Sequence, residues 1–169
     1  LGQINLAVAD VTTNVSDSCG IDTAYLNQYI YTCANTGSNL VNIVAIDVNG
    51  NVTSDTAQIV ILDTVSPTFN LVLQYTLYLN NLGLANLAYA DVAVGTAYDA
   101  CGIFDTLISK TVFNCIDTGS HTVFITLKDN NGNTITKSVS ISVLDTINPT
   151  ITTQSAVFFI DTLTGIALM

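Results

Sequence analysis

The sequence contains no glutamate, no arginine and no tryptophan, and its 13 acidic residues are balanced by only three lysines. The net charge of −10 argues against nucleic acid as a partner, because so few cations cannot neutralise a row of phosphates. It argues equally against an anionic membrane surface. Since charged residues make up only 9% of the chain, we expect Thr, Asn and Ser to cover most of the surface.

Long hydrophobic runs are also absent, although the mean hydropathy of +0.52 is high. No stretch approaches the roughly 20 apolar residues that a membrane-spanning helix needs, so we expect no membrane insertion. The start of the chain shows no signal-peptide pattern, and it carries Leu1 in place of Met. This start indicates a processed or excised fragment.

The strongest positive signal is an internal repeat. When residues 17–68 are laid over residues 99–150 without a gap, 20 of the 52 positions are identical. The matching positions include both cysteines of each copy, an Asn-Gly pair and a proline, all at one constant offset along the chain. An offset of this size indicates domains strung in tandem rather than the shorter units of a solenoid.

The repeat also sets the expected boundaries. We predict a complete module over 67–148, a module lacking its leading strands over 1–66, and the leading strands of a following module over 149–169. Residues 150–163 should be extended and should pair with the first module of a neighbouring copy or with the continuation of a longer chain. The side chains expected to point inward there are Ile151, Thr153, Val157 and Phe159.

Within each module, apolar and polar residues alternate. Residues 122–128 and 138–143 follow this period of two, and residues 57–61 keep the same phase in the first copy. An Asn-Gly pair at 49–50, repeated at 131–132, predicts a hairpin between two such stretches. The pattern predicts an all-β fold of tandem Ig-like antiparallel β-sandwich modules of about 82 residues.

Each copy carries two cysteines at the same short spacing: Cys19 and Cys33 in the first copy, Cys101 and Cys115 in the second. This spacing fits neither a zinc site nor a redox Cys-x-x-Cys motif. A bridge across a strand–turn–strand segment would contribute roughly 3 kcal/mol and keep each module self-contained. We therefore predict Cys19–Cys33 and Cys101–Cys115 disulfides, with buried free thiols or crosslinks between chains as the alternatives. Disulfides imply an oxidising, extracellular compartment.

Four aspartates are the candidate metal ligands. The Asp-x-Asn-Gly-Asn segments are interpreted as turns, because an EF-hand loop needs its glycine and its acidic residue at other positions. Asp63 and Asp145, each just before a proline-containing link, could instead meet Asp17 or Asp99 in a calcium site at a module junction. We expect no other cofactor.

Catalytic motifs are missing as well. The sequence holds no serine-hydrolase, zinc-protease or phosphate-loop motif and no pair of glutamates. The one histidine, His121, matches Asn39 in the other copy, and we expect it to be an exposed strand residue rather than a base. The chain is predicted not to be an enzyme.

Three motifs recur in both copies: Asp-x-Cys-Gly-Ile, Asp-x-Asn-Gly-Asn and Leu-Asp-Thr-x-x-Pro-Thr. Together they resemble the hyalin-repeat-like and PKD-like Ig modules of long Bacteroidota surface adhesins, which include gliding-motility adhesins and prey-capture filaments exported by type IX secretion. The resemblance implies a structural and adhesive module at the cell surface. Its partners would be copies of itself in a fibre, together with a cell-surface or glycan ligand.

The resemblance also implies O-glycosylation, because Bacteroidota modify secreted proteins at Asp-Thr followed by an apolar residue. The matching candidates are Thr23, Thr56, Thr64, Thr106, Thr146 and Thr162. The alternative explanation is that Asp and Thr are simply abundant at strand ends.

A different function also stays open: an accessory carbohydrate-binding or linker module of a secreted enzyme. Sugar sites usually use aromatic platforms, whereas this chain has no Trp and its seven tyrosines do not cluster in one loop. Long regular fibres in native material would favour the filament, and a soluble monomer with polysaccharide affinity would favour the accessory module.

Overall fold

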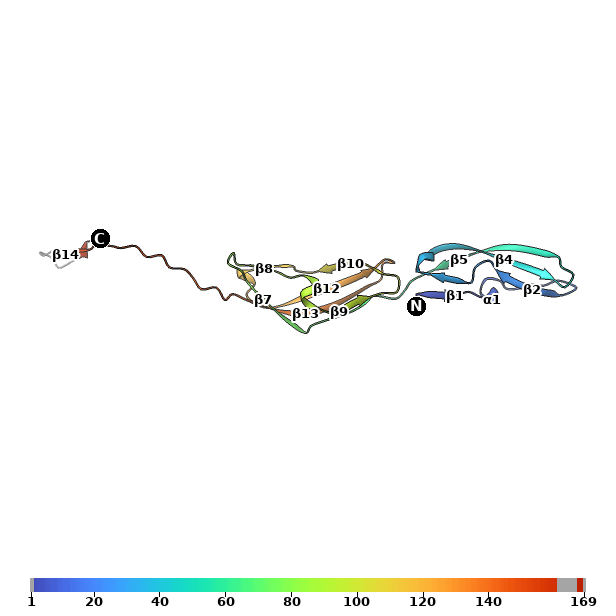
Figure 1. Cartoon of the computed structure of the whole chain (residues 1–169), viewed down its shortest axis with the longest axis horizontal. Coiled ribbons are helices and arrows are strands. Elements are labelled where there is room, and N and C mark those ends of the chain that lie inside the picture. Colours follow the sequence, from blue (N-terminus) through green and yellow to red (C-terminus); the bar gives the residue numbers. More distant parts are fainter. Residues whose placement is uncertain (1, 161–166, 169) are drawn as a thin grey trace.

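The computed structural model describes residues 2–160 and 167–168. Two β-sandwich modules follow one another along an elongated chain, and an extended segment leads away from the second module (Figure 1). The prediction of tandem all-β sandwich modules is confirmed.

The second module is built from three sheets that share one core. A four-stranded sheet has the order β10–β12–β13–β7, and two-stranded sheets pair β6 with β9 and β8 with β11. All these pairs are antiparallel except β7 and β13, which are parallel. The elements are β6 (Thr68–Leu71), β7 (Gln74–Tyr78), β8 (Leu84–Asn86), α2 (Tyr89–Val92), β9 (Ala93–Tyr98), β10 (Ile103–Ile108), β11 (Val112–Asn114), the 3₁₀ turn η2 (Cys115–Asp117), β12 (Gly119–Asp129) and β13 (Thr134–Leu144).

The alternation read from the sequence places the core of this module correctly. Val123, Ile125 and Leu127 of β12 are buried, whereas Phe124 between them is 52% exposed. β13 buries alternate residues in the same way: Val139, Ile141 and Val143. Side chains from β6, β7, β8 and β11 close the same hydrophobic cluster, so strands far apart in the sequence depend on one core.

The first module repeats the second from β8 onward, except that it lacks β9. Its elements are β1 (Gln3–Asn5), α1 (Val8–Val11), β2 (Ile21–Leu26), β3 (Ile30–Thr32), the 3₁₀ turn η1 (Cys33–Asn35), β4 (Gly37–Asp47) and β5 (Val52–Ile61). They form a three-stranded sheet β2–β4–β5 and a two-stranded sheet β1–β3. Within residues 2–66 there is no counterpart of β6, β7 or β9.

The missing strands leave the core of the first module open. Ala57, Ile59 and Ile61 on β5 keep the predicted inward phase, but they are only half-buried. Their counterparts on β13 are buried, because β7 and the β6–β9 sheet lie over that side of the second module. The two modules therefore share a topology but differ in how completely they are packed.

Both predicted hairpins are confirmed. β4 joins β5, and β12 joins β13, through a turn at each Asn-Gly pair. Gly50 and Gly132 have φ of 85° and 97°, a conformation that costs glycine little. The one-turn helices α1 and α2 are not predicted by periodicity, because a single turn is too short for one. Asp10 and Asp91 cap them by accepting a backbone hydrogen bond at 2.7 Å.

After β13 the chain leaves its own module. Residues 145–158 form no helix or strand, and Ile151 is 86% exposed. The short strands β14 (Phe159–Ile160) and β15 (Ala167–Leu168) pair with each other. The predicted extended conformation is thus found over 150–158, whereas its pairing with another module stays a prediction. Phe159 was also expected to point inward, but its side chain is not among those that the structure describes, and residues 161–163 lie outside the described residues.

No helix among the described residues is both long enough and apolar enough to cross a membrane.

Candidate functional site at the module junction

A disulfide joins the two modules. The sulfurs of Cys33 and Cys101 are 2.02 Å apart and their Cα atoms 5.1 Å apart. Cys33 begins η1 in the first module, and Cys101 lies in the loop before β10 in the second. The predicted Cys19–Cys33 and Cys101–Cys115 bridges are therefore wrong, since Cys19 and Cys115 are exposed and unpaired in the described chain.

The intramodular pairing fails because the two cysteines of a module lie at opposite ends of it. Cys19 lies beside the end of β4, where Val48 N–H donates to the Gly20 carbonyl at 3.2 Å. Cys33 lies just before the start of β4, a strand of 11 residues. Such a strand spans about 33 Å, far beyond the Cα separation that a disulfide allows.

The segment between the cysteines also does not turn back on itself. β2 pairs with β4 in one sheet, whereas β3 pairs with β1 in the other. The second module repeats this arrangement, with Cys101 at the β12 end and Cys115 at the β12 start. We call Cys19 and Cys101 the head cysteines and Cys33 and Cys115 the tail cysteines.

The linker between the modules is fixed by the β12–β13 hairpin. The Asn133 side-chain amide donates to the carbonyls of Asp63 at 3.1 Å and Val65 at 3.4 Å. The Ser66 hydroxyl donates to the Thr134 carbonyl at 3.1 Å. The disulfide and these three hydrogen bonds restrain the second module from several directions.

Asn133 is itself held by Asp129, a buried carboxylate at the end of β12. Asp129 accepts hydrogen bonds from the Asn133 backbone and side chain at 2.8 Å and from the Asn131 backbone at 2.9 Å. Burial acts to raise the pKa of Asp129, but these hydrogen bonds outweigh it and hold the pKa below its usual value. The turn that contacts the linker is thus held by hydrogen bonds of its own.

Gly2 lies directly against the disulfide. Its φ is 79°, and a Cβ there would come within 3.0 Å of both the Cys33 sulfur and the Ala100 side chain. A larger residue would push the two modules apart at the point where they are bonded. Glycine at this position is therefore part of the junction, a role that the sequence analysis missed.

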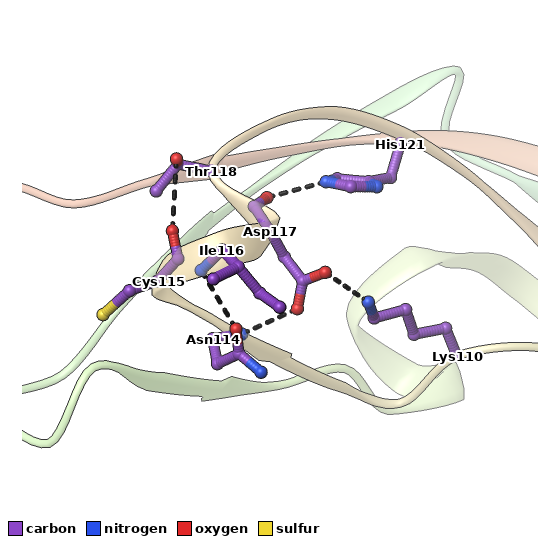
Figure 2. A network of polar contacts seen from close by, with 7 residues as sticks. All are labelled: Lys110, Asn114, Cys115, Ile116, Asp117, Thr118 and His121. Atoms are coloured by element: carbon purple, nitrogen blue, oxygen red, sulfur yellow. Dashed lines mark hydrogen bonds and ion pairs between the residues drawn. The ribbon is translucent and has the colours of Figure 1, made fainter.

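The loop around the tail cysteine is shaped by a polar network (Figure 2). In the second module, Lys110 Nζ donates to Asp117 Oδ1 at 2.5 Å, and the Asn114 backbone donates to Asp117 Oδ2 at 3.0 Å. These two hydrogen bonds, the one from Lys110 first, lower the pKa of the Asp117 carboxyl. His121 Nε2 donates to the Asp117 carbonyl at 2.7 Å.

His121 differs from the prediction in its surroundings. It lies on β12 as a strand residue, but it is half-buried rather than exposed, and its ring meets Phe113 edge-on at 5.8 Å. Its hydrogen bond to a backbone carbonyl gives it a structural role in the loop.

The first module makes the same loop without charge. Asn35 replaces Asp117 and accepts from the Thr32 backbone at 3.0 Å, while Asn39 replaces His121 and donates to the Asn35 carbonyl at 2.6 Å. The two modules thus present their tail cysteines on equivalent loops built from different residues.

We expect Asp117→Asn to weaken the second module at pH 7 and to have a smaller effect at pH 3. The folded-state pKa of Asp117 lies below the unfolded value of about 3.9, so its contribution is present above that pH and is lost as the pH falls through the folded value. Urea unfolding of both proteins at the two pH values measures this difference. A gap in unfolding free energy that is the same at pH 7 and pH 3 would exclude a contribution from the ionised pair.

Two of the four calcium candidates do meet at the junction. Ligand atoms of Asp63, Asp99 and Cys101 lie within 4.8 Å of one another, and Asp63 Oδ2 is buried without a hydrogen-bond partner. The Cys101 sulfur is used in the disulfide, and Asp17 and Asp145 do not join this group in the described chain. Two carboxylates fall short of the roughly six to eight oxygens that Ca²⁺ takes, so calcium binding stays a prediction.

The glycosylation candidates are mostly accessible. Thr23, Thr56, Thr64 and Thr146 are exposed and Thr106 is half-buried, whereas Thr162 lies outside the described residues. Their occupancy also stays a prediction.

The fold and the junction define a class of protein: tandem Ig-like β-sandwich modules bonded to one another. Among solved structures, the chain is similar to the fibronectin(III)-like modules of Clostridium thermocellum CbhA, with 15% identity over 84% of this chain and 88% of that chain. The TM-score is 0.35, a level at which the similarity supports no argument about function. No protein-family profile matches the sequence, and no curated protein matches it.

Proposed function

We propose that this chain is a structural and adhesive repeat of an extracellular bacterial surface filament, where it attaches the cell to surfaces or to other cells. The Cys33–Cys101 bond between the modules is the observation that carries the proposal. Successive domains with small contacts normally move relative to one another. A covalent bond beside a hydrogen-bonded linker makes a stiff rod instead, which suits a stalk that transmits force.

Three further observations support this function. A disulfide at the junction fits an oxidising, extracellular compartment. Exposed Asp-Thr sites on a weakly charged surface would accept the glycans expected of a secreted Bacteroidota protein. Exposed apolar side chains such as Ile116, which is 91% exposed in the tail-cysteine loop, offer adhesive contacts. The recurring motifs support assignment to type IX-exported adhesins of gliding or predatory cells.

Immunogold electron microscopy on native cells tests the proposal, using antibodies raised against this chain. We expect label along regular filaments on the outer surface, removed when the antibody is first absorbed with the purified chain. Label confined to the cell interior would contradict the proposal. Recovery of the chain only in a soluble secreted enzyme that binds polysaccharide would instead support the accessory-module function.

A further inference from the structure

The two unpaired cysteines are counterparts of the two that are bonded. In the repeat, Cys19 occupies the position of Cys101, and Cys115 occupies the position of Cys33. The module pair therefore contains one complete junction between the modules, together with a head half on the first module and a tail half on the second. Both unpaired cysteines are exposed.

The loop that carries Cys115, the tail half, has the same contacts as the loop that carries the bonded Cys33. The Cys115 sulfur lies 3.8 Å from the Gly83 carbonyl oxygen, and the Cys33 sulfur lies 3.6 Å from that of Gly2. Gly83 has φ of 71° and no room for a side chain, because a Cβ would lie 2.5 Å from the Cys115 sulfur. The second module thus presents Cys115 as the first presents Cys33.

The head half matches as well. Asp17 Oδ1 accepts a hydrogen bond from the Cys19 backbone at 2.7 Å, and Asp99 Oδ1 accepts one from the Cys101 backbone at the same distance. The glycine carbonyl after each cysteine accepts a backbone hydrogen bond from the following hairpin at 3.2 Å. The loop of Cys19 therefore has its bonding-competent shape without a partner.

The first module also contains a hollow of about 260 Å³, whose lining includes Ile21, Ile43, Ala45 and Asp55 beside several Ser, Thr and Asn residues. The counterparts of these residues in the second module are Ile103, Ile125, Leu127 and Lys137.

In the second module this position is filled. Phe69 of β6 is 3% exposed and belongs to one hydrophobic cluster with Ile125 and Leu127, with Ile103 packed against it. Lys137 Nζ lies 5.2 Å from the centre of the Phe69 ring. The hollow in the first module is thus the position that a β6 strand occupies.

A segment that fits the hollow follows the second module. Ile151 is the counterpart of Phe69 in the repeat, and it is exposed to solvent. The linker leading to it repeats the linker between the modules: Asp145 Oδ1 accepts from the Ile147 backbone at 3.0 Å, as Asp63 Oδ1 accepts from the Val65 backbone at 3.1 Å. The segment that follows β13 therefore begins with the same hydrogen bond as the linker that leads from the first module into the second.

We propose that two copies of this chain join head to tail through a second junction. Cys115 of one copy bonds to Cys19 of the next, and Ile151 of the first copy fills the hollow in the first module of the second copy. The contact is heterologous, so it propagates into a fibre rather than closing as a symmetric dimer. It deepens the proposed function and rests on it for the oxidising compartment.

The bond forms by thiol–disulfide exchange with a small-molecule disulfide such as oxidised glutathione. The thiolate of one cysteine attacks this oxidant, forms a mixed disulfide and releases one small thiol. The thiolate of the second cysteine then attacks the mixed disulfide and releases the other. Two protein thiols lose two protons and two electrons, and the oxidant is reduced to two small thiols.

The test uses purified full chain with the Cys33–Cys101 bond intact, in a glutathione redox buffer. We expect the unaltered chain to form a ladder of covalent oligomers on a non-reducing gel. Cys19→Ser and Cys115→Ser should each abolish the ladder. An equimolar mixture of the two variants should form a single dimer at least tenfold faster than either alone, linked between Cys115 of one and Cys19 of the other.

A pair of matched substitutions tests the docking of the tail. In the Cys19→Ser chain, Ile151→Asp should slow formation of the mixed dimer about tenfold, because it would place a carboxylate against Ile21, Ile43 and Ala45 and beside the like charge of Asp55. Thr152→Asp is the control, since its counterpart Asn70 is exposed on β6. Both residues are exposed in their own chain, so neither variant should disturb its folding.

Three results would overturn the proposal: no mixed dimer, single variants that dimerise as fast as the mixture, or equal effects of the two tail substitutions. None of these results bears on whether native filaments carry the chain at the cell surface. Surface labelling and head-to-tail bonding can therefore fail separately.

Discussion

Ile141→Ala should lower the free energy of unfolding of the second module by about 2–5 kcal/mol, because Ile141 is fully buried on β13 and its removal leaves a cavity. The counterpart Ile59→Ala in the first module should cost less than half as much, because Ile59 is only half-buried. Hydrogen exchange followed by mass spectrometry measures the two modules separately in one chain. The Cys115→Ser background keeps the protein from forming head-to-tail oligomers during the measurement.

This pair of substitutions tests whether the first module is completed from outside. Ser138→Ala, at an exposed position on β13, is a control that should change the unfolding free energy by less than about 0.5 kcal/mol. Equal costs for Ile59→Ala and Ile141→Ala in the monomer would show that the first module closes its core unaided. The hollow would then need no occupant.

Removing the junction disulfide should have a comparably large effect. The double substitution Cys33→Ser with Cys101→Ser should destabilise the chain by about 4 kcal/mol through the loop-closure entropy of the unfolded state. The bond spans 68 residues and closes a loop that includes parts of both modules. Denaturant unfolding measures the loss, and small-angle scattering should show a broader distribution of distances between the modules.

Cys19→Ser with Cys115→Ser is the matched control for this experiment. It also removes two cysteines, but two exposed ones that make no bond within the described chain. It should change the unfolding free energy by less than about 0.5 kcal/mol. If the two double variants were equally stable, the Cys33–Cys101 bond would not hold the modules together.

The fold follows from local patterns that do not depend on distant contacts. Alternation on β12 places Val123 inside and Phe124 outside, because successive strand residues point to opposite faces. Each Asn-Gly pair sets a hairpin through the turn that glycine permits. The parallel pairing of β7 with β13 could not be predicted from these local patterns, because the two strands are separated by most of the module's sequence.

The cysteine pairing was missed because spacing along the chain does not give distance in space. The short spacing suggests a loop that returns, whereas here the chain crosses from the β2 sheet to the β3 sheet without turning back. What the spacing did not show is that the 11-residue strand β4 separates the two cysteine positions of a module. A head cysteine lies at one end of this strand and a tail cysteine at the other, so the bond must join neighbouring modules.

Other parts of the junction had a weaker signal in the sequence. The sequence analysis left open that Asp63 could meet Asp99 at a junction, and the two do meet, because the linker that carries Asp63 reaches the end of the second module where Asp99 lies. Gly2 and Gly83 stand at matching positions, but nothing local shows that a cysteine from a distant loop lies against them. Asn133 was read only as a turn residue, although it also binds the linker.

Non-reducing digestion with a protease that cleaves before aspartate tests the central claim most directly. Cleavage at the aspartates separates all four cysteines into the peptides 17–21, 22–46, 99–104 and 105–116. In monomeric chain we expect 22–46 linked to 99–104, with the other two peptides carrying free thiols. Peptide 17–21 linked to 22–46, together with 99–104 linked to 105–116, would contradict a disulfide between the modules.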